Sequence, residues 1–564
     1  MDIRKTILYF GLAVLGVMLW HTWQHDYPSP AQLAAASSVD TNVAKHPAEF
    51  APAANGQSAP SYQANAKTLA TALPDDKLIT VKTDLISAKI NLRGGDMVEA
   101  KLLHYPVSLA DKNNAIQILN PNNDALYIAQ SGLSVPSQQK AATPIMYSSA
   151  ESHYALKSGD KSLVVTLKGE NSAGLSVVKT FTFKPNEYAV QTGMQLTNTA
   201  SQPWQGNVYN QITRRFVPLT DAFSSRSYDG PAVSTENTPY KKLPYATLSE
   251  SNFSRDIQNG WIAMQQHYFL SAWVAPKNQT LHYYSRSFGQ GDDGKNNIFI
   301  LGYMSAPIQL APNASTTFNS VLYVGPEIAK NLTPIAKSLN LTVDYGWLWP
   351  ISKFLFWLMS EIHRFVGNWG WSIILVTIAI KLAFYWLSNK SYASMAKTRE
   401  LQPKIKALQE RYGDDKQAMS KAMMEMYRKE KINPLGGCLP MVIQIPVFIA
   451  LYYVLIESVE LRQAPFIFWI HDLSMKDPYF ILPILMGLSM LLQQKISPPP
   501  PDPAQAKMMM MLPIVFTVFF ATFPAGLVLY WITNNCASIL QQWFVMKTHK
   551  AKTAKIASGK KSHK

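Results

Sequence analysis

The stretch NWGWSIILVTIAIKLAFYWLS, residues 368–388, decides the fold class. Lys381 is its one charged residue, and the apolar residues on both sides of it form a long hydrophobic run. A helix needs about 20 mostly apolar residues to cross the hydrocarbon core of a bilayer. The sequence therefore predicts a membrane-spanning helix, with a lysine inside it.

Five further stretches have the same character. The apolar run 6–23 follows two basic residues. We interpret it as an uncleaved anchor rather than a signal peptide. The reason is that the small residues at 34–36 lie too far from this run for an ordinary cleavage site. The other candidate spans are 438–458, 479–496, 508–523 and 525–546. Several are shorter than a standard span, so we expect the bilayer to be thinner around the bundle.

Charge predicts the orientation of these six spans. The chain has 52 Lys and Arg against 36 Asp and Glu, a net charge of +16. About +14 of this falls in four segments that six spans would place on one side: the N-terminus, 390–431, 495–507 and 547–564. Basic residues mark cytoplasmic segments. Both termini are therefore predicted to be cytoplasmic, and the large segment after the first span lies outside.

The sequence of that outer segment predicts a β domain. Residues 24–75 are rich in Ala, Pro, Ser and Gln and predict a flexible tether. Alternation at 86–92 is followed by the turn Arg93-Gly94-Gly95-Asp96, and strand-like runs recur at 190–196, 296–304 and 317–324. Short alternating strands separated by turn residues predict a large antiparallel β-sandwich.

Two more helical segments flank the first core span. Apolar residues recur at helical spacing from Ile351 to Phe365, among several aromatic residues, which predicts an amphipathic helix in the membrane interface. A helix packed on the β domain is the alternative. Between 390 and 437 two apolar stripes separated by Gly413 predict a cytoplasmic helical hairpin, whose stripes pack on each other or receive partners.

The complete prediction is a polytopic α-helical membrane protein with six transmembrane helices and a large outer β-sandwich. Its parts are an N-terminal anchor, 1–23; a tether, 24–75; the β domain, 76–340; an interfacial helix, 341–367; a five-helix core, 368–546, with the hairpin 390–437; and a basic tail, 547–564.

Motifs of catalysis are scarce. The sequence contains no P-loop, no HExxH and no GxSxG, and the five C-terminal spans contain no His. Their interiors also lack Asp and Glu, although a proton-coupled transporter normally keeps an acidic relay there. We therefore predict no enzyme activity, no cofactor and no metal site.

Lys381 is the candidate site. With a straight helix it would lie about eight residues, or roughly 12 Å, from the cytoplasmic end of its span. It either snorkels to the interface or faces a water-filled cavity among the helices. Polar residues that could line such a groove are Thr377, Gln444, Asn534 and Gln541. A hydrated cationic pocket would lower the barrier for the polar flanks of an entering membrane segment, whose apolar helix could meet Ile445, Phe448, Phe519 and Phe520.

Several long motifs resemble those of the YidC/Oxa/Alb family of membrane protein insertases, in its Gram-negative form. The motifs are VDYGW (343–347), GNWG (367–370), LQPKI (401–405), GDDKQ (413–417), NPLGGC (433–438), VELRQAP (459–465), IHDL (470–473) and GLVLY (526–530). They occur in the family's order along nearly the whole chain.

The resemblance implies an inner-membrane insertase and chaperone that works alone or beside the Sec translocon on nascent membrane proteins. It implies a mutarotase-like β supersandwich in the periplasm and a hydrophilic groove whose family arginine is Lys381 here. Lysine keeps the charge but lacks the guanidinium fork. The family's substrate-contacting surface maps to Ile445, Phe448 and Phe519, with Tyr530 and Trp531 beside it. The hairpin and the basic tail would contact the ribosome, the signal recognition particle receptor or membrane lipids.

Two other functions remain open from the residues alone. One is a transporter or channel, and the other is a membrane-anchored periplasmic carbohydrate-active protein. The missing intramembrane acids argue against the first. Clustered His and carboxylates in a cleft of the β domain would support the second.

Overall fold

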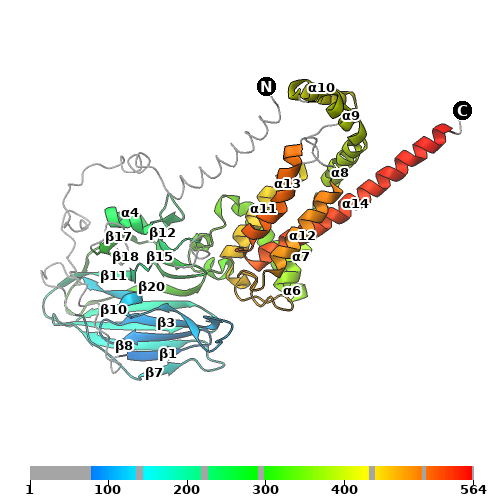
Figure 1. Cartoon of the computed structure of the whole chain (residues 1–564). Helices are drawn as coiled ribbons and strands as arrows, with labels where there is room; N and C mark the ends of the chain where they lie inside the picture. Colours follow the sequence, from blue (N-terminus) through cyan, green and yellow to red (C-terminus); the bar gives the residue numbers. More distant parts are fainter. Residues whose placement is uncertain are drawn as a thin grey trace. The chain divides into compact units, whose positions relative to one another are not determined.

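The computed structural model describes residues 78–134, 144–217, 227–289, 297–413, 415–430, 439–497 and 503–561. The predicted anchor and tether lie outside these residues. Within them, the chain forms a body of β-strands followed by a group of helices (Figure 1).

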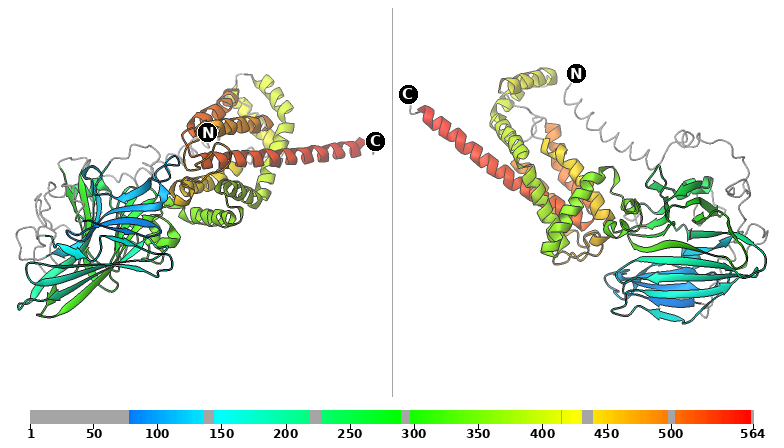
Figure 2. Two further views of the ribbon diagram at one scale, coloured as in Figure 1. Left: turned by 90° about the horizontal axis from the view of Figure 1, so that it is seen from below. Right: turned by 180° about the vertical axis from the view of Figure 1, so that it is seen from behind.

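The strands form two sheets stacked face to face, as both views in Figure 2 show. The 11-stranded sheet has the order β14 (Ser254–Gln258), β17 (Thr280–Phe288), β18 (Ile298–Met304), β11 (Trp204–Arg215), β5 (Tyr127–Ser134), β3 (Asp96–Pro106), β2 (Ile86–Asn91), β1 (Leu78–Lys82) and β7 (His153–Ala155), with β19 (Ile308–Leu310) beside β11 and β4 (Ala115–Leu119) beside β3. The 9-stranded sheet has the order β13 (Lys241–Lys242), β12 (Gly230–Val233), β15 (Trp261–Gln266), β16 (Phe269–Val274), β20 (Ser315–Pro326), β10 (Ala189–Asn198), β9 (Leu175–Phe183), β8 (Leu163–Glu170) and β6 (Tyr147–Ser149).

The predicted antiparallel sandwich is confirmed. Among the described strands, neighbours pair antiparallel except β1 and β7, which are parallel. Alternation places one face of each strand inside; in β9 every second residue from Leu175 to Phe183 is buried. The expected turn before β3 contains Gly94 and Gly95, whose φ angles of 92° and 65° disfavour residues with a side chain.

Large aromatic side chains join the two sheets. The Tyr127 hydroxyl on β5 donates to the Met264 carbonyl on β15 at 2.7 Å and accepts from Ser271 on β16 at 2.6 Å. The Trp273 indole on β16 donates to the Gln211 carbonyl on β11 at 3.1 Å. These bonds satisfy polar groups that would otherwise be costly inside a core held without disulfides.

Short helices connect and follow the strands. They are η2 (Asn123–Ala125), α4 (Tyr245–Glu250), α5 (Ala329–Leu332), η4 (Leu339–Thr342), η5 (Gly346–Leu348) and, later, η7 (Val459–Leu461). The long helices are α6 (Trp349–Val366), α7 (Trp369–Ala383), α8 (Tyr385–Glu400), α9 (Gln402–Tyr412), α10 (Lys416–Lys429), α11 (Leu439–Glu457), α12 (Ile481–Ile496), α13 (Pro503–Phe520) and α14 (Ala525–Lys561).

Helix α6 packs on other helices rather than on the β domain. Ser352, Leu355 and Met359 form its buried face, and the Ser352 hydroxyl donates to the Ala450 carbonyl on α11 at 3.0 Å. Phe354 belongs to the predicted apolar stripe but is exposed. Leu355 of the same stripe is buried, and Ile351, Leu358 and Ile362 are partly buried against the core, so the predicted stripe covers the packed face of α6 and an exposed apolar edge beside it.

The first core span is bent. Helices α7 and α8 meet at Phe384 at 69°, although the sequence around the bend contains neither Pro nor Gly. The expected straight helix over 368–388 is therefore wrong, and only Leu382 and Ala383 follow Lys381 within α7. The 12 Å depth, which assumed a straight helix, no longer applies.

Helix length and hydropathy do not confirm six spans. In the described part of the chain no single helix is both long and apolar enough to cross a membrane, and the bent pair α7–α8 is the one combination that meets the criterion. Shorter apolar helices cover Ile443–Glu457, Ile481–Ile496 and Ala506–Phe520.

The predicted hairpin forms between α9 and α10. Its core is Leu401, Ile405, Met423 and Tyr427, so the two stripes pack on each other. Asp415 begins α10 by accepting hydrogen bonds from the backbone N–H groups of Gln417 and Ala418.

Candidate functional site

Three core helices bring polar side chains together around Lys381. The Lys381 ammonium on α7 donates to the Ser538 hydroxyl on α14 at 2.8 Å and to the Gln444 amide oxygen on α11 at 3.3 Å. Gln444 in turn donates to the Tyr530 hydroxyl at 3.2 Å and contacts Asn534. We call these five residues the Lys381 network.

The sequence places three of these residues on one side of α14. Tyr530, Asn534 and Ser538 follow each other at four-residue spacing, which puts them on the same helical face. The Ser538 hydroxyl donates to the Asn534 carbonyl at 2.7 Å, so its oxygen is held ready to accept from Lys381. On α11, Pro446 lies two residues after Gln444.

The network holds a cation among neutral partners. Lys381 is half-buried, and among the described residues no carboxylate forms an ion pair with it. Burying an unpaired charge costs free energy unless polar groups solvate it. The hydroxyl and amide oxygens of Ser538 and Gln444 supply that solvation without neutralising the charge, so it stays available to an anionic group.

Two of the four predicted groove residues join the network, and two do not. Gln444 and Asn534 belong to it. Thr377 is buried and donates to the Ile373 carbonyl of its own helix at 2.6 Å. Gln541 donates to the Tyr385 carbonyl at 3.1 Å and the Asn389 side chain at 2.8 Å, and so ties α14 to α8.

Sequence reasoning missed Ser538. Nothing near this serine in sequence marks a site, and serines in membrane helices commonly serve only in helix packing. The four-residue spacing from Asn534 was the available indication, since it aligns both side chains on one face of α14.

The predicted contact residues divide by exposure. Ile445 and Phe519 are exposed, at 44% and 55%. Phe448 and Trp531 are partly buried with ring centroids 4.8 Å apart, and Tyr530 is buried. Contact of these five with substrate stays a prediction; in this conformation Ile445 and Phe519 present the most accessible surface.

Phe520, which the sequence suggested could meet the apolar helix of a substrate, presents almost no accessible surface. It is 2% exposed and packs against Phe448, Phe516, Phe523 and Trp531. The reason is helical geometry: Phe519 and Phe520 are adjacent, so their side chains point in directions about 100° apart.

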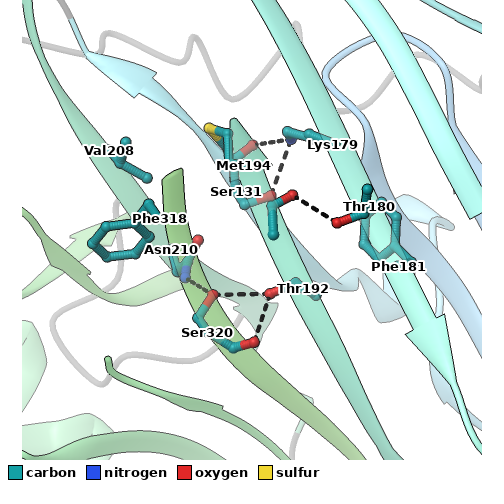
Figure 3. A pocket seen from close by; sticks show the side chains of 11 residues that line it. Ser131, Lys179, Thr180, Phe181, Thr192, Met194, Val208, Asn210, Phe318 and Ser320 are labelled. Carbon is teal, nitrogen blue, oxygen red and sulfur yellow. Dashed lines mark hydrogen bonds between the residues drawn. The ribbon is translucent and has the colours of Figure 1, made fainter. Parts of the chain in front are cut away.

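A second polar cluster lies between the sheets of the β domain (Figure 3). The Lys179 ammonium on β9 donates to the carbonyls of Gly94 and Ser131, both at 2.6 Å. Beside it, Ser320 accepts from Asn210 at 2.8 Å and bonds to Thr192 at 2.9 Å. These groups satisfy one another across the sandwich, which favours a structural role.

Burial controls the titration of this cluster. Lys179 is 2% exposed, and burial lowers the pKa of its ammonium to about 8, while the nearby Asp96 carboxylate opposes the shift. Burial also raises the pKa of Asp96, against the charge of Lys179 and hydrogen bonds from Gln130 and Ser131. In the described part of the chain no group of three or more His, Cys, Asp or Glu residues could hold a metal ion.

Two family models match the chain. The YidC periplasmic domain matches residues 78–358, and the 60Kd inner membrane protein matches residues 361–553. The boundary between them falls within α6, where the β domain has ended and the core helices begin.

Curated relatives match over almost the entire chain. The membrane protein insertase YidC of Coxiella burnetii (strain Dugway 5J108-111) is 52% identical over 560 residues, covering 99% of this chain and 98% of the relative. The proteins of the same name from Nitrosococcus oceani and Legionella pneumophila (strain Paris) are 45% and 46% identical, each covering 97% of this chain and 99% and 98% of the relative. A solved structure titled as an active YidC insertase with its first transmembrane domain resolved covers 83% of this chain and 92% of its own, at 16% identity and a TM-score of 0.39.

The curated matches support neither the transporter nor the carbohydrate-active alternative. They extend through both the β domain and the core helices, at identities far above those needed to establish kinship. Together with the two family models, they show that this chain belongs to the YidC family of membrane protein insertases.

Proposed function

We propose that this chain is a membrane protein insertase and chaperone, which inserts integral inner-membrane proteins and helps them to fold. The observation that carries the proposal is the Lys381 network, a cation solvated by neutral groups, in a chain 52% identical along its length to a protein named as an insertase. An insertase with such a site needs neither a catalytic residue nor a cofactor.

The proposed topology has six membrane spans, both termini in the cytoplasm and the β domain in the periplasm. The charge distribution supports it, because about +14 of the net +16 lies in segments assigned to the cytoplasm. The short apolar helices α12 and α13 would thin the bilayer locally. The parts keep the boundaries predicted above. Helices α7 and α8 form a bent second span, and the chain leaves the membrane within α8, where the segment 390–437 begins.

The groove would act on the polar part of a substrate. A segment that enters the membrane carries polar flanks, and moving them through hydrocarbon is the main barrier. Lys381 would attract acidic side chains of the translocated flank, while the amide of Gln444 and the hydroxyl of Ser538 offer replacement hydrogen bonds. The burial of about 20 apolar residues then drives insertion without another energy source.

The apolar part of the substrate would meet the exposed side chains near the groove. Ile445 on α11 and Phe519 on α13 are the accessible members of the predicted contact set. Phe448, Tyr530 and Trp531 form the packed layer behind them and would contact substrate when the helices separate.

The proposed partners follow from the family. Nascent membrane proteins are the substrates, and the chain would act alone or with the Sec translocon. The α9–α10 hairpin and the basic tail 547–564 would contact the ribosome or the signal recognition particle receptor, since both carry a positive net charge on the proposed cytoplasmic side.

Depletion tests the proposal directly. The chain is placed under a repressible promoter in its own host, and insertion of a small two-span protein is followed by protease accessibility from the periplasm. We expect the substrate to remain uninserted on depletion and to recover with a plasmid copy. Normal insertion in depleted cells would contradict the proposed function, and export of a soluble secreted protein serves as the control for general membrane damage.

A further inference from the structure

A serine, a histidine and an aspartate meet on two neighbouring strands of the β domain. The Ser254 hydroxyl on β14 lies 3.2 Å from Nε2 of His282 on β17. Nδ1 of the same imidazole lies 2.7 Å from the Asp256 carboxylate on β14. His282 therefore bonds to both partners, one through each ring nitrogen. We call these three residues the β14–β17 triad.

The pairing of the two strands explains why these side chains meet. Ser254 and Asp256 are two residues apart on β14, so both point to the same face of the sheet. Asp256 lies directly opposite His282 in the antiparallel ladder, and Ser254 lies diagonally from it. A backbone hydrogen bond joins Ser285 to Phe253, and bonded and non-bonded pairs alternate along such a ladder. Asp256 and His282 therefore form a non-bonded pair, in which opposite side chains are closest.

The other face of the same strands anchors the triad. Ile257 of β14 and Leu281 and Tyr283 of β17 belong to the hydrophobic core, and each is at most 4% exposed. Side chains on packed strands are held more firmly than side chains on loops. The His282 side chain is 11% exposed, whereas Ser254 is exposed. The imidazole is thus held in place while its serine partner is accessible to a reactant.

The order of the hydrogen bonds suits proton transfer. An ionised carboxylate only accepts hydrogen bonds, so Nδ1 of the neutral imidazole carries the proton that bonds to Asp256. Nε2 is then the unprotonated nitrogen, and it accepts the hydrogen bond from the Ser254 hydroxyl. This is the arrangement in which a histidine can take the proton of a serine nucleophile.

The edge of the sheet supplies a donor for developing negative charge. Among the strands that the structure describes, β14 is the outermost in its sheet. Because the backbone of Phe253 bonds toward β17, alternation turns the N–H of Ser254 away from β17 and toward the open edge. In the Ser-His-Asp template the N–H of the nucleophile is one of the two donors to the oxyanion.

We propose that the β14–β17 triad cleaves small carboxylic esters by acyl transfer. Oγ of Ser254 forms a bond to the acyl carbon while its proton moves to Nε2 of His282. His282 gives that proton to the alcohol oxygen as the ester C–O bond breaks. Water, deprotonated by His282, then attacks the acyl carbon, and Oγ leaves and regains the proton. The balance is ester plus water to acid plus alcohol, with Asp256 as a positioning residue for His282.

This activity is separate from membrane insertion, and short motifs do not reveal it. His282 is 28 residues from Ser254 and 26 from Asp256. The prediction of no enzyme activity depends on motifs within one segment, whereas strand pairing creates the triad. The triad lies on an outer face of the sheet, where the reacting group rather than a long acyl chain must provide the contacts. A small ester is therefore the substrate class.

Labelling by a fluorophosphonate tests the nucleophile. The purified full-length chain in detergent is treated with the probe, which forms an Oγ–P bond with an activated serine and releases fluoride. Mass spectrometry then identifies the modified peptide. We expect the label on Ser254 and its loss in Ser254→Ala. His282→Gln should lower the labelling rate at least about 100-fold, because a general base contributes roughly 10²–10⁴-fold. Hydrolysis of p-nitrophenyl acetate should fall in parallel.

Two variants of Asp256 test the positioning role. Asp256→Asn no longer holds Nδ1–H through a carboxylate and should lower the labelling rate at least about tenfold. Asp256→Glu keeps the carboxylate and should retain more of the rate than Asp256→Asn. Melting temperatures of both variants close to native would show that the fold is intact. Equal labelling rates in the two variants would exclude a positioning role for the carboxylate.

Ser152 provides a matched control in the same domain. Its hydroxyl lies 2.9 Å from Nδ1 of His153, and both residues are exposed. Among the described residues no carboxylate forms an ion pair with His153. We expect Ser152 to stay unlabelled and Ser152→Ala to keep the native rate. Equal labelling of Ser152 and Ser254, or an ester hydrolysis rate unchanged in Ser254→Ala, would overturn the proposal.

A parallel insertion assay keeps the two proposals separate. Ser254→Ala leaves the Lys381 network untouched and should insert the two-span substrate in depleted cells as the native chain does. Lost ester hydrolysis with intact insertion supports an independent site. Hydrolysis that depends on Ser254 in a chain that inserts nothing would contradict the proposed function and leave the triad standing.

Discussion

The Lys381 ammonium lies 2.8 Å from the Ser538 hydroxyl, although 157 residues separate them in sequence. This contact joins α7 to α14 and fixes the cation beside Gln444 of α11. Lys381 therefore supplies both the charge of the site and a contact between helices, and substitutions can test each of these roles.

The charge at residue 381 should decide which substrates insert. Lys381→Arg keeps the cation, so we expect activity close to native for most substrates. Lys381→Glu replaces attraction by repulsion, and we expect insertion of substrates with acidic translocated segments to fall at least tenfold, equivalent to about 1.4 kcal/mol. Protease accessibility of the substrate in depleted cells measures this.

Lys353→Glu is the matched control for that experiment, since it makes the same charge change at an exposed position of α6. A Lys381→Glu chain that inserts acidic substrates as well as the native chain would exclude the cationic role of the groove.

Replacing each of two glutamines in the helix bundle by methionine should affect the stability of the bundle differently. Gln444 is bonded at both ends, to Lys381 and to Tyr530, so Gln444→Met should destabilise the bundle by about 1–3 kcal/mol. The amide nitrogen of buried Gln542 donates to Ser497 at 3.2 Å, but its oxygen has no hydrogen-bond partner among the residues that the structure describes. Gln542→Met should be neutral or stabilising, because it removes an unsatisfied polar group.

Thermal unfolding of both variants in the same detergent compares them. Ser497 keeps a bond to the Gln493 carbonyl in either case, so it is not left unpaired. A larger loss of thermal stability in Gln542→Met than in Gln444→Met would contradict this prediction, which is based on the hydrogen bonds of the two side chains.

Stability should fall as the pH rises, in part through Glu327. Burial raises the pKa of this carboxyl well above 4.5, with an opposing hydrogen bond from Gln265 at 2.9 Å. Above pH 4.5 the unfolded chain therefore loses a proton that the folded chain keeps, and stability declines until the pH passes the folded pKa. The slope for one proton is at most about 1.4 kcal/mol per pH unit.

Glu327→Gln should flatten that decline as the pH rises above 5, while preserving the contact with Gln265. Melting temperatures at four or five pH values, in native and variant chains, measure it. Parallel curves for the two proteins would assign the pH dependence to other groups.

The stabilities contributed by the Lys179 and Asp96 side chains in the β domain should be coupled. Lys179→Met removes the nearby cation that favours the ionised Asp96 carboxylate, which keeps its hydrogen bonds from Gln130 and Ser131. It also leaves the Gly94 and Ser131 carbonyls without the ammonium, so it should cost about 1–3 kcal/mol for each carbonyl left unsatisfied. The double variant Lys179→Met/Asp96→Ala should lose less than Lys179→Met alone, because no charge remains uncompensated. Urea unfolding followed through the β domain's tryptophans provides the measurement, and a simple sum of the two single effects would contradict the coupling.

Local sequence was sufficient for many elements. The alternation of Ile86, Ala88 and Ile90 and the turn at Gly94 correspond to β2 and the start of β3. The break at Gly413 separates α9 from α10 as expected. These features depend on residues within one or two turns of one another, so a single sequence can reveal them.

Some features had no local indication. The bend between α7 and α8 occurs without Pro or Gly, and nothing in the sequence around Phe384 accounts for it. Phe520 is buried although the adjacent Phe519 is exposed, and Lys179 is buried among apolar neighbours in β9. Both outcomes depend on which other elements pack against each face of the helix or strand.

The sequence by itself determined the division into a β domain and hydrophobic helices, the asymmetry of charge and the presence of a cation at residue 381. These are properties of composition and short-range spacing, which folding does not alter. Only the tertiary structure decided that Ser538 and Gln444, rather than Thr377 and Gln541, bond to Lys381. Such choices depend on the rotation of each helix about its axis, which is set by packing among α7, α8, α11 and α14.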